Sequence, residues 1–248
     1  MNRYGLLGFK LSHSKSKVIH EYFFDKNNID ATYDLIELEK DQLESQIDLI
    51  KNGYYKGYNV TIPYKEEVMK YCDELTIAAK EIGAVNTIYL SNGNVIGDNT
   101  DYLGFIDEVK KFNIDLKGKT SYVLGSGGAS KAICYALEKM GSNVVIVSRK
   151  NSIHTYESLN EISHFDLIVN TTPVGMYPNV HEEILPIDIV KKAECCIDLI
   201  CNPKQTKFLQ YSNRGYNGNY MLIFQAYYAE KLWGNNIVFD IEELHNML

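Results

Sequence analysis

Hydrophobic and polar positions change period repeatedly along the first part of the chain, which indicates that strands and helices alternate. Short apolar runs at 3–9 and 31–38 predict strands. Residues 16–28 and 40–53 instead carry their apolar side chains at helical spacing, and the second of these segments ends in Asn-Gly, a helix stop. This order predicts an α/β unit at the start of the chain.

The segment GYNVTIPYKEE, at 57–67, begins as a strand and stops at a proline. Its residues up to Ile62 suit a half-buried strand, whereas Pro63 cannot continue a central strand because it has no backbone N–H. Lys65 follows just past this break. The pattern leaves two interpretations of Lys65 open: a solubilising loop charge, or a charge presented to a ligand.

Further helix candidates lie around 66–72 and 74–81. Residues 85–99 predict a β-hairpin with Asn92-Gly93 at its turn. The segment GDNTDYLGF, at 97–105, marks the point where this hairpin ends and a helix begins. These elements complete the first predicted unit.

The second part of the chain contains a complete βαβ unit. A strand at 121–124 enters a glycine loop, a helix at 129–140 and a second strand, and such crossovers are right-handed. The segments 165–176 and 195–203 are each a strand that ends in a polar turn, at the edge of a doubly wound sheet where ligands bind. The segment 220–234 is a strongly apolar helix that needs a core to bury it.

Composition and charge narrow the functional classes. The 248 residues are 45% hydrophobic and 23% charged, which is typical of a soluble protein of one large or two small domains. A net charge of −7 argues against sequence-independent binding of nucleic acid. No apolar run approaches the length of a membrane span, and residues 1–10 lack the features of a signal peptide.

Cysteine and histidine patterns give no indication of a metal site. The five cysteines are odd in number and show no CxxC pairing, which favours reduced thiols in the cytoplasm over a disulfide framework. The six histidines lack ligand-like spacing. We therefore predict a cytoplasmic protein without a metal.

The glycine loop GSGGAS, at 125–130, has the spacing G-x-G-x-x-S between a strand and a helix. Gly125 permits a tight turn, and Gly127 lets backbone amides approach a pyrophosphate at the positive end of the helix. A glycine-rich turn between a strand and a helix is common without any ligand. Its place inside a βαβ unit makes dinucleotide binding the stronger interpretation.

The end of the second cofactor strand indicates the type of dinucleotide. An NAD-binding unit carries a carboxylate here for the ribose 2′-hydroxyl, whereas this chain has Ser148, Arg149 and Lys150. Arg149 can bind a 2′-phosphate through paired hydrogen bonds, and a carboxylate would repel it. NADP(H) is therefore the predicted cofactor, with a solvated basic turn as the alternative.

Three polar residues of the first unit allow both a structural and a functional interpretation. Asp101 is either the cap of the helix that follows the hairpin or a site residue. Ser16 is either the N-cap of its helix or, with Ser14, part of a carboxylate-binding turn of hydroxyls and free amides. His20 falls inside the same helix and is expected to be structural.

Seven motifs in order give the chain a family resemblance. They are HSKS at 13–16, NVTIPYK at 59–65, GAVNT at 83–87, GDNTD at 97–101, GSGGAS at 125–130, NTTPVGM at 170–176 and MLIFQA at 221–226. Together they cover nearly the whole chain, and it resembles the shikimate 5-dehydrogenases, within the shikimate/quinate dehydrogenase family. The resemblance implies NADPH-dependent reduction of the C5 ketone of 3-dehydroshikimate to shikimate, a step of aromatic amino acid biosynthesis.

The resemblance also implies roles for single residues. Lys65 and Asp101 would be the catalytic pair, with Lys65 as general acid and base. Ser14 and Ser16 would hold the substrate carboxylate. The residues implied for the ring hydroxyls are Thr61, Asn86, Asp101 and Gln225. The residues implied for NADP(H) are Gly125, Ser126, Gly127, Gly128, Ala129, Ser148, Arg149, Lys150, Thr171 and Met221, with Thr171 and Met221 beside the nicotinamide.

The fold that the resemblance implies is two α/β domains with a cleft between them. Residues 1–102 and 223–248 would form the substrate-binding domain, with the C-terminal helix returning to it. Residues 103–222 would form the Rossmann-like NADP-binding domain. The resemblance leaves a monomer and a homodimer open.

The chain departs from the family pattern at several positions. Lys10 and Lys17 stand where prolines are usual, which predicts looser loop geometry with little chemical change. Cys201 replaces a tyrosine that commonly lines the site, which predicts a roomier pocket. The basic turn after the second cofactor strand lacks a further basic residue at Ile153, which predicts weaker selectivity for NADP.

Two alternatives to the biosynthetic dehydrogenase stay open at this point. One is a quinate/shikimate dehydrogenase that uses NAD, and the other is a catalytically silent NADPH-binding module. The presence of both Lys65 and Asp101 argues against the silent module.

Overall fold

The computed structural model describes residues 1–149 and 154–248, and the chain divides into two compact units. The first unit comprises Met1–Gly104 and Leu222–Leu248, and the second comprises Phe105–Met221. Each contains one β-sheet with helices packed on it, so the predicted fold class of two α/β domains is confirmed. Lys150 and Ile153 lie outside the described residues. The substrate and cofactor roles of the two units stay predictions at this point.

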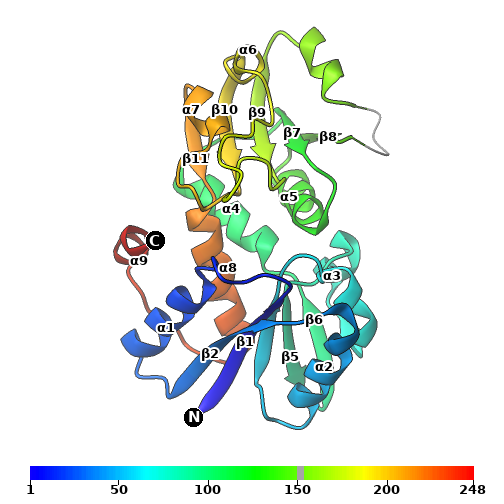
Figure 1. The fold of residues 1–248 in the computed structure, drawn as a ribbon, viewed down its shortest axis with the longest axis vertical. Coiled ribbons are helices and arrows are strands. Elements are labelled where there is room, and N and C mark those ends of the chain that lie inside the picture. Colours follow the sequence, from blue (N-terminus) through cyan, green and yellow to red (C-terminus); the bar gives the residue numbers. More distant parts are fainter. Residues whose placement is uncertain (150–153) are drawn as a thin grey trace. The chain divides into compact units, whose positions relative to one another are not determined.

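The first unit is built on a six-stranded mixed sheet of order β2-β1-β3-β5-β6-β4 (Figure 1). Its strands are β1 (Asn2–Gly8), β2 (Ala31–Glu37), β3 (Gly57–Val60), β4 (Glu74–Leu75), β5 (Thr87–Ser91) and β6 (Asn94–Asp98). Its helices and 3₁₀ turns are α1 (Ser16–Lys26), η1 (Lys40–Gln42), α2 (Leu43–Lys51), η2 (Glu67–Tyr71), α3 (Ile77–Ile82) and α9 (Ile241–Met247). The pairs β1–β2, β1–β3 and β4–β6 are parallel, and β3–β5 and β5–β6 are antiparallel.

Side chains of the first sheet alternate between two apolar layers, as the strand period requires. Leu7 and Tyr58 face a core that α2 and α3 complete. Tyr4 and Tyr33 face a second cluster with Phe24 of α1. The C-terminal helices return to this unit, because apolar residues of α1, α8 and α9 form one further buried cluster. The strongly apolar segment predicted near 220–234 therefore finds its core here.

Three local predictions differ from the structure. The strand at 57 ends at Val60, and Thr61 and Ile62 belong to the turn that follows it, with Ile62 exposed. The segment 66–72 forms the 3₁₀ turn η2, and 74–81 contains the short strand β4 before α3 begins. β4 pairs with β6, so a partner distant in sequence decides its conformation.

The second unit contains a parallel five-stranded sheet of order β11-β10-β9-β7-β8. Its strands are β7 (Thr120–Leu124), β8 (Asn143–Val147), β9 (Phe165–Asn170), β10 (Ala193–Asp198) and β11 (Gly215–Asn217). Its helices and 3₁₀ turn are α5 (Gly128–Lys139), η3 (Glu157–Glu161), α6 (Ile187–Val190) and α7 (Lys207–Tyr211). The strand order reverses between β7 and β9, and ligands of doubly wound sheets bind at such a switch point.

Two helices carry the chain across the boundary between the units. They are α4 (Asp101–Lys111) and α8 (Asn219–Leu232) (Figure 1). Among the described residues, no helix has the length and apolar character that crossing a membrane requires.

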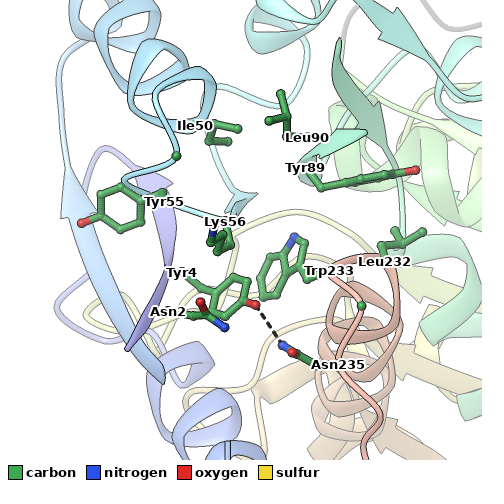
Figure 2. A pocket seen from close by; sticks show the side chains of 12 residues that line it. Asn2, Tyr4, Ile50, Tyr55, Lys56, Tyr89, Leu90, Leu232, Trp233 and Asn235 are labelled. Carbon is green, nitrogen blue, oxygen red and sulfur yellow. Dashed lines mark hydrogen bonds between the residues drawn. The ribbon is translucent and has the colours of Figure 1, made fainter. Parts of the chain in front are cut away.

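Gly57 at the start of β3 leaves the space that Trp233 occupies. A Cβ atom at Gly57 would lie 2.1 Å from the Trp233 indole nitrogen. That nitrogen donates a hydrogen bond to the Ile88 carbonyl at 3.2 Å. The other side of the indole stacks on Tyr4, with ring centroids 4.6 Å apart (Figure 2). The close approach therefore requires a residue without a side chain at position 57.

We expect Gly57→Ala to lower the free energy of unfolding by about 1–3 kcal/mol, because the indole must leave its place. A urea titration followed by circular dichroism measures this loss. Trp233→Leu removes the obstacle, so the double variant should lose clearly less than the sum of the two single losses. Strict additivity would show that the two residues do not compete for the same space.

Candidate active site

Lys65 and Asp101 form a largely buried ion pair in the first unit. The Lys65 ammonium donates to Asp101 Oδ2 at 2.5 Å, and the two side chains are 13% and 7% exposed. They come from different loops: Lys65 follows the turn after β3, and Asp101 begins α4 after β6. A charge that only kept the chain soluble would lie in water. The geometry therefore favours the second interpretation of Lys65, a charge held in place inside the protein.

Asn86 connects this pair to the rest of the site. Its side-chain NH₂ group donates to Asp101 Oδ1 at 2.8 Å and to Gln225 Oε1 at 3.2 Å. The same group donates to the Thr100 hydroxyl at 3.0 Å, and the side-chain oxygen Asn86 Oδ1 accepts from the Thr100 N–H at 2.6 Å. Asn86 is 2% exposed, and each of these partners belongs to the protein. It fixes the orientation of the Asp101 carboxylate.

Backbone hydrogen bonds hold the two loops in register. The Lys65 carbonyl accepts from the Val85 N–H at 2.8 Å, which ties the loop that carries Lys65 to the residue before Asn86. The Asp101 N–H donates to the Asn99 side-chain oxygen at 3.0 Å, which caps the start of α4. Asn99 rather than Asp101 therefore supplies the cap, and the Asp101 carboxylate is left for Lys65 and Asn86.

Ser14 and Ser16 lie together in the loop before α1. The Ser16 N–H donates to the Ser14 hydroxyl oxygen at 3.2 Å. The N-cap position belongs to Lys15 and Ser16 is the first helical residue, so the N-cap interpretation of Ser16 is wrong by one position. Ser14 satisfies the first free amide, which is the function that a cap residue normally has.

Thr61 lies at the same edge of the first sheet as this loop. β1 and β3 are parallel neighbours, so their carboxyl ends meet. A Cβ atom on Gly8 would contact both Leu11 and the Thr61 methyl group, which places Thr61 against the end of β1. The structure thus groups Lys65, Asp101, Asn86 and Gln225 by direct contact, and it groups Ser14 with Ser16.

The glycine loop of the second unit has the geometry of an open anion cradle. Gly125 has φ +113°, and a Cβ atom there would lie 2.7 Å from the Thr171 hydroxyl oxygen. A Cβ atom on Gly127 would meet no atom within 4 Å among the described residues. α5 begins at Gly128, and its N-cap Gly127 offers no side chain to the first amides. The first turn of α5 therefore has no side-chain cap and lies beside open space, as phosphate binding requires.

Ser130 stabilises the glycine loop through a hydrogen bond. Its hydroxyl donates to the Gly125 carbonyl oxygen at 2.8 Å, and the side chain is buried. The serine at the third position of the glycine motif therefore serves the loop itself. Ser126 is exposed and Ala129 is half-buried, so both lie at the surface of the cradle.

The turn after β8 presents Arg149 to solvent. Arg149 is exposed, whereas Ser148 is buried and its N–H donates to the His154 carbonyl at 3.3 Å. Burial raises the pKa of the Tyr156 phenol, and the positive charge of Arg149 partly offsets that rise. Arg149 is therefore an exposed cation just after β8. Lys150 lies outside the described residues.

Thr171 follows β9 on the other side of the switch point from β8. Its hydroxyl donates to the Leu124 carbonyl at 2.6 Å, which joins the turn after β9 to the strand that enters the glycine loop. Asp198 supports this turn, since Asn170 Nδ2 donates to its Oδ1 at 3.0 Å and the Thr206 hydroxyl donates to its Oδ2 at 2.5 Å. Burial raises the pKa of Asp198 to about 6, and these hydrogen bonds only partly offset the rise.

Met221 is buried in the first turn of α8, and its N–H donates to Glu108 Oε1 at 3.2 Å. Burial raises the pKa of the Glu108 carboxyl to about 8.

A surface pocket of about 440 Å³ in the first unit is separate from these residues (Figure 2). It lies between Tyr4, Lys56, Tyr89 and Trp233. Of the described residues that line it, none belongs to the predicted substrate set.

The buried residues that support the site through hydrogen bonds were not predicted from the sequence. Asn59 donates to the Asn86 carbonyl oxygen at 3.3 Å and accepts from the Tyr33 hydroxyl at 2.8 Å. Asn59 is the first letter of the NVTIPYK motif, and an asparagine inside an apolar strand was the available signal. Asp198 gave a similar signal, since it is an acid within the apolar segment CCIDLI, whereas Glu108 stands among other charged residues and gave none.

Comparison with known proteins connects this geometry to one family. Residues 6–88 match the family model described as "Shikimate dehydrogenase substrate binding domain". The chain is 43% identical to the curated shikimate dehydrogenase (NADP(+)) of Clostridium beijerinckii, over 94% of this chain and 92% of that protein. The chain belongs to the shikimate dehydrogenase family.

Solved structures of shikimate dehydrogenases agree over the full length. Shikimate dehydrogenase 1 from Peptoclostridium difficile superimposes with a TM-score of 0.92 and 40% identity, covering 100% of this chain and 97% of that one. Shikimate 5-dehydrogenase from Thermus thermophilus, solved with NADP(H) and shikimate, gives a TM-score of 0.89 at 27% identity, covering 99% and 98%. The shikimate dehydrogenase fold therefore extends over both units.

We expect Asp198→Asn to change how the stability of this shikimate dehydrogenase depends on pH. The folded state holds the Asp198 proton up to a pKa of about 6, whereas an unfolded aspartate releases it near pH 4. Raising the pH from 4 to 6 therefore favours the unfolded chain, by about 1.4 kcal/mol per pH unit for this group. Asparagine mimics the protonated acid and does not titrate.

The difference in free energy of unfolding, variant minus wild type, should therefore rise between pH 4 and 6 and stay level from 6 to 8. Urea titrations at each pH measure it. A difference that is constant from pH 4 to 8 would contradict the raised pKa of Asp198.

Proposed function

We propose that this chain catalyses the reversible, NADP(H)-dependent reduction of 3-dehydroshikimate to shikimate in the biosynthesis of aromatic amino acids. The observation that carries the proposal is the Lys65–Asp101 pair, held by Asn86 in a chain of the shikimate dehydrogenase family. A family member without activity would have no need to keep a lysine ammonium in a largely buried ion pair. The curated relative from Clostridium beijerinckii carries the same activity in its name.

The second unit has groups that fit NADP(H). The open space over Gly127 and the uncapped first turn of α5 suit a pyrophosphate. Arg149 at the end of β8 suits a 2′-phosphate, together with Ser148 and Lys150. Thr171 and Met221 are the residues assigned to the nicotinamide. When bound, the cofactor supplies the hydride that the carbonyl carbon accepts.

Lys65 supplies the proton that the reduction requires. As the carbonyl carbon gains hydride, its oxygen becomes negative, and the Lys65 ammonium stabilises this charge and transfers a proton to it. In the oxidation of shikimate, neutral Lys65 takes the proton back from the hydroxyl. Asp101 remains a carboxylate throughout: it orients the lysine and accepts a hydrogen bond from a neighbouring substrate hydroxyl.

The remaining polar groups hold the substrate. Ser14 and Ser16 bind its carboxylate at the start of α1, where the helix dipole favours an anion. Thr61, Asn86 and Gln225 hydrogen-bond the ring hydroxyls. Because Asn86 already bonds both Asp101 and Gln225, these groups are oriented before substrate arrives.

We further propose that the enzyme acts in the cytoplasm, as a monomer or a homodimer. None of the five cysteines, all within the described residues, forms a disulfide, which suits a reducing compartment.

A spectrophotometric assay at 340 nm tests the proposed function. Shikimate and quinate are each offered with NADP and with NAD. The proposal predicts that shikimate with NADP gives the highest kcat/KM of the four. Preference for quinate with NAD would establish the NAD-linked alternative, and no turnover in any combination despite NADPH binding would establish the silent module.

Lys65→Ala should lower kcat for shikimate oxidation by about 10²–10⁴-fold, because the group that moves the proton is lost. The dissociation constant for NADPH should stay within about twofold, because Lys65 belongs to the first unit. Stopped-flow or steady-state absorbance and NADPH fluorescence provide the two measurements. Lys80→Ala, a matched exposed lysine of the same unit, should leave both unchanged. Near-wild-type turnover of Lys65→Ala would refute its role.

Arg149→Ala should raise KM for NADP by about tenfold or more and leave KM for NAD nearly unchanged, since only NADP carries the 2′-phosphate. Steady-state kinetics with both cofactors measures the ratio. Lys139→Ala, at the far end of α5 from the glycine loop, serves as the charge-matched control. Equal effects on both cofactors would mean that Arg149 does not bind the 2′-phosphate of NADP.

A further inference from the structure

The last part of α4 packs against the first turn of α8 inside the second unit. The Phe112 ring stacks on Tyr216 with centroids 3.8 Å apart and meets Tyr220 edge-on at 5.5 Å. The Lys111 ammonium lies 4.8 Å from the centre of the Tyr220 ring. These contacts place the start of α8 next to the helix that begins at Asp101. Glu108 lies one turn before Phe112, whose N–H donates to the Glu108 backbone carbonyl at 3.1 Å.

Glu108 is the one fully buried acid of this helix contact among the described residues, with 0% exposure. Its Oε1 accepts the Met221 N–H at 3.2 Å. Its Oε2 has no hydrogen-bond partner within the described part of the chain. Met221 is the third residue of α8, so its N–H has no acceptor within its own helix. Glu108 thus supplies from α4 the acceptor that a capping side chain usually provides.

An acid at this position is costly for stability. The carboxyl must stay protonated at neutral pH or carry a charge in an apolar contact, and one of its oxygens lacks a partner among the described residues. An apolar side chain of the same size would avoid both costs. Groups retained at such a cost are frequently tied to function, and Glu108 touches a residue assigned to the nicotinamide.

The two connecting helices each carry two site-related residues on one face. Asp101 and Glu108 are seven residues apart in α4, close to two full turns. Met221 and Gln225 are four residues apart in α8. The first unit ties its part of α4 to its part of α8 through Asn86, which bonds both Asp101 and Gln225. The second unit does the same through Glu108 and the Met221 N–H.

We propose that Glu108 is a positioning residue for the cofactor: through its bond to the Met221 N–H it fixes the first turn of α8, and with it the Met221 side chain, against the nicotinamide. This inference rests on the proposed function, because Met221 receives its role there. Glu108 acts through Met221 and takes no part in proton transfer.

Three variants separate positioning from stability. Glu108→Leu keeps the approximate volume and removes the acceptor, and Glu108→Gln keeps a carbonyl acceptor and the shape of the protonated acid. Val109→Ala, at the neighbouring buried position of α4, loosens packing without changing the Glu108 carboxyl. For each we measure the dissociation constant of NADPH by fluorescence, KM for shikimate, kcat and the melting temperature of the full chain.

Glu108→Leu should weaken NADPH binding about tenfold, because the Met221 N–H loses its acceptor. Its melting temperature should stay close to that of wild type, because removal of the buried acid offsets the unsatisfied Met221 N–H, and KM for shikimate should stay within about twofold. Glu108→Gln should restore NADPH binding to within about twofold of wild type, since its carbonyl oxygen can accept the same hydrogen bond. Val109→Ala should lower the melting temperature and leave NADPH binding unchanged.

Two outcomes would overturn the inference: wild-type NADPH affinity in Glu108→Leu, or equal losses in Glu108→Leu and Glu108→Gln. Because NADPH binding is measured without turnover, a wild-type protein that binds NADPH but does not oxidise shikimate would refute the proposed function and still leave the comparison of variants decisive. A wild-type protein that does not bind NADPH would refute both.

Discussion

The largely buried ion pair between Lys65 and Asp101 is the interaction on which the rest of the first unit depends. Removing water from two charges is costly, and only close contact together with further hydrogen bonds offsets that cost. Asn86 supplies the hydrogen bond to the second carboxylate oxygen, and Thr100 and Gln225 satisfy Asn86 in turn. The strands β3, β5 and β6 and the helix α8 meet around this one pair.

The second unit differs, because its two buried acids, Glu108 and Asp198, have no cationic partner among the described residues. Asp198 accepts hydrogen bonds from Asn170 at the end of β9 and from Thr206 just before α7, and Glu108 accepts one from the first turn of α8. Burial raises the pKa of each, and each carboxyl group acts as a hydrogen-bond acceptor that holds a neighbouring segment in place. One unit therefore buries a charged pair, and the other buries single acids whose hydrogen bonds hold neighbouring segments in place.

Local sequence signals predicted those elements whose conformation depends only on residues near them in the sequence. Asn92 and Gly93 adopt positive φ in the turn between β5 and β6, and the strand, glycine loop and helix at 120–139 form as the motif indicates. β4 was not predicted because its conformation comes from pairing with β6. The role proposed for Lys65 came from the family resemblance, because the local pattern left a loop charge and a presented charge open. The contacts of Asn59, Asp198 and Glu108 were not predicted, because burial and partners distant in sequence define them.

A double-mutant cycle on kcat tests most directly whether Lys65 and Asp101 act together. The cycle compares Asp101→Asn, Lys65→Ala and the double variant in shikimate oxidation with NADP. A pair that works together predicts a double variant about as slow as Lys65→Ala alone, because the first substitution already removes what the second would disturb. Single losses that multiply in the double variant would contradict this, since the two residues would then act independently.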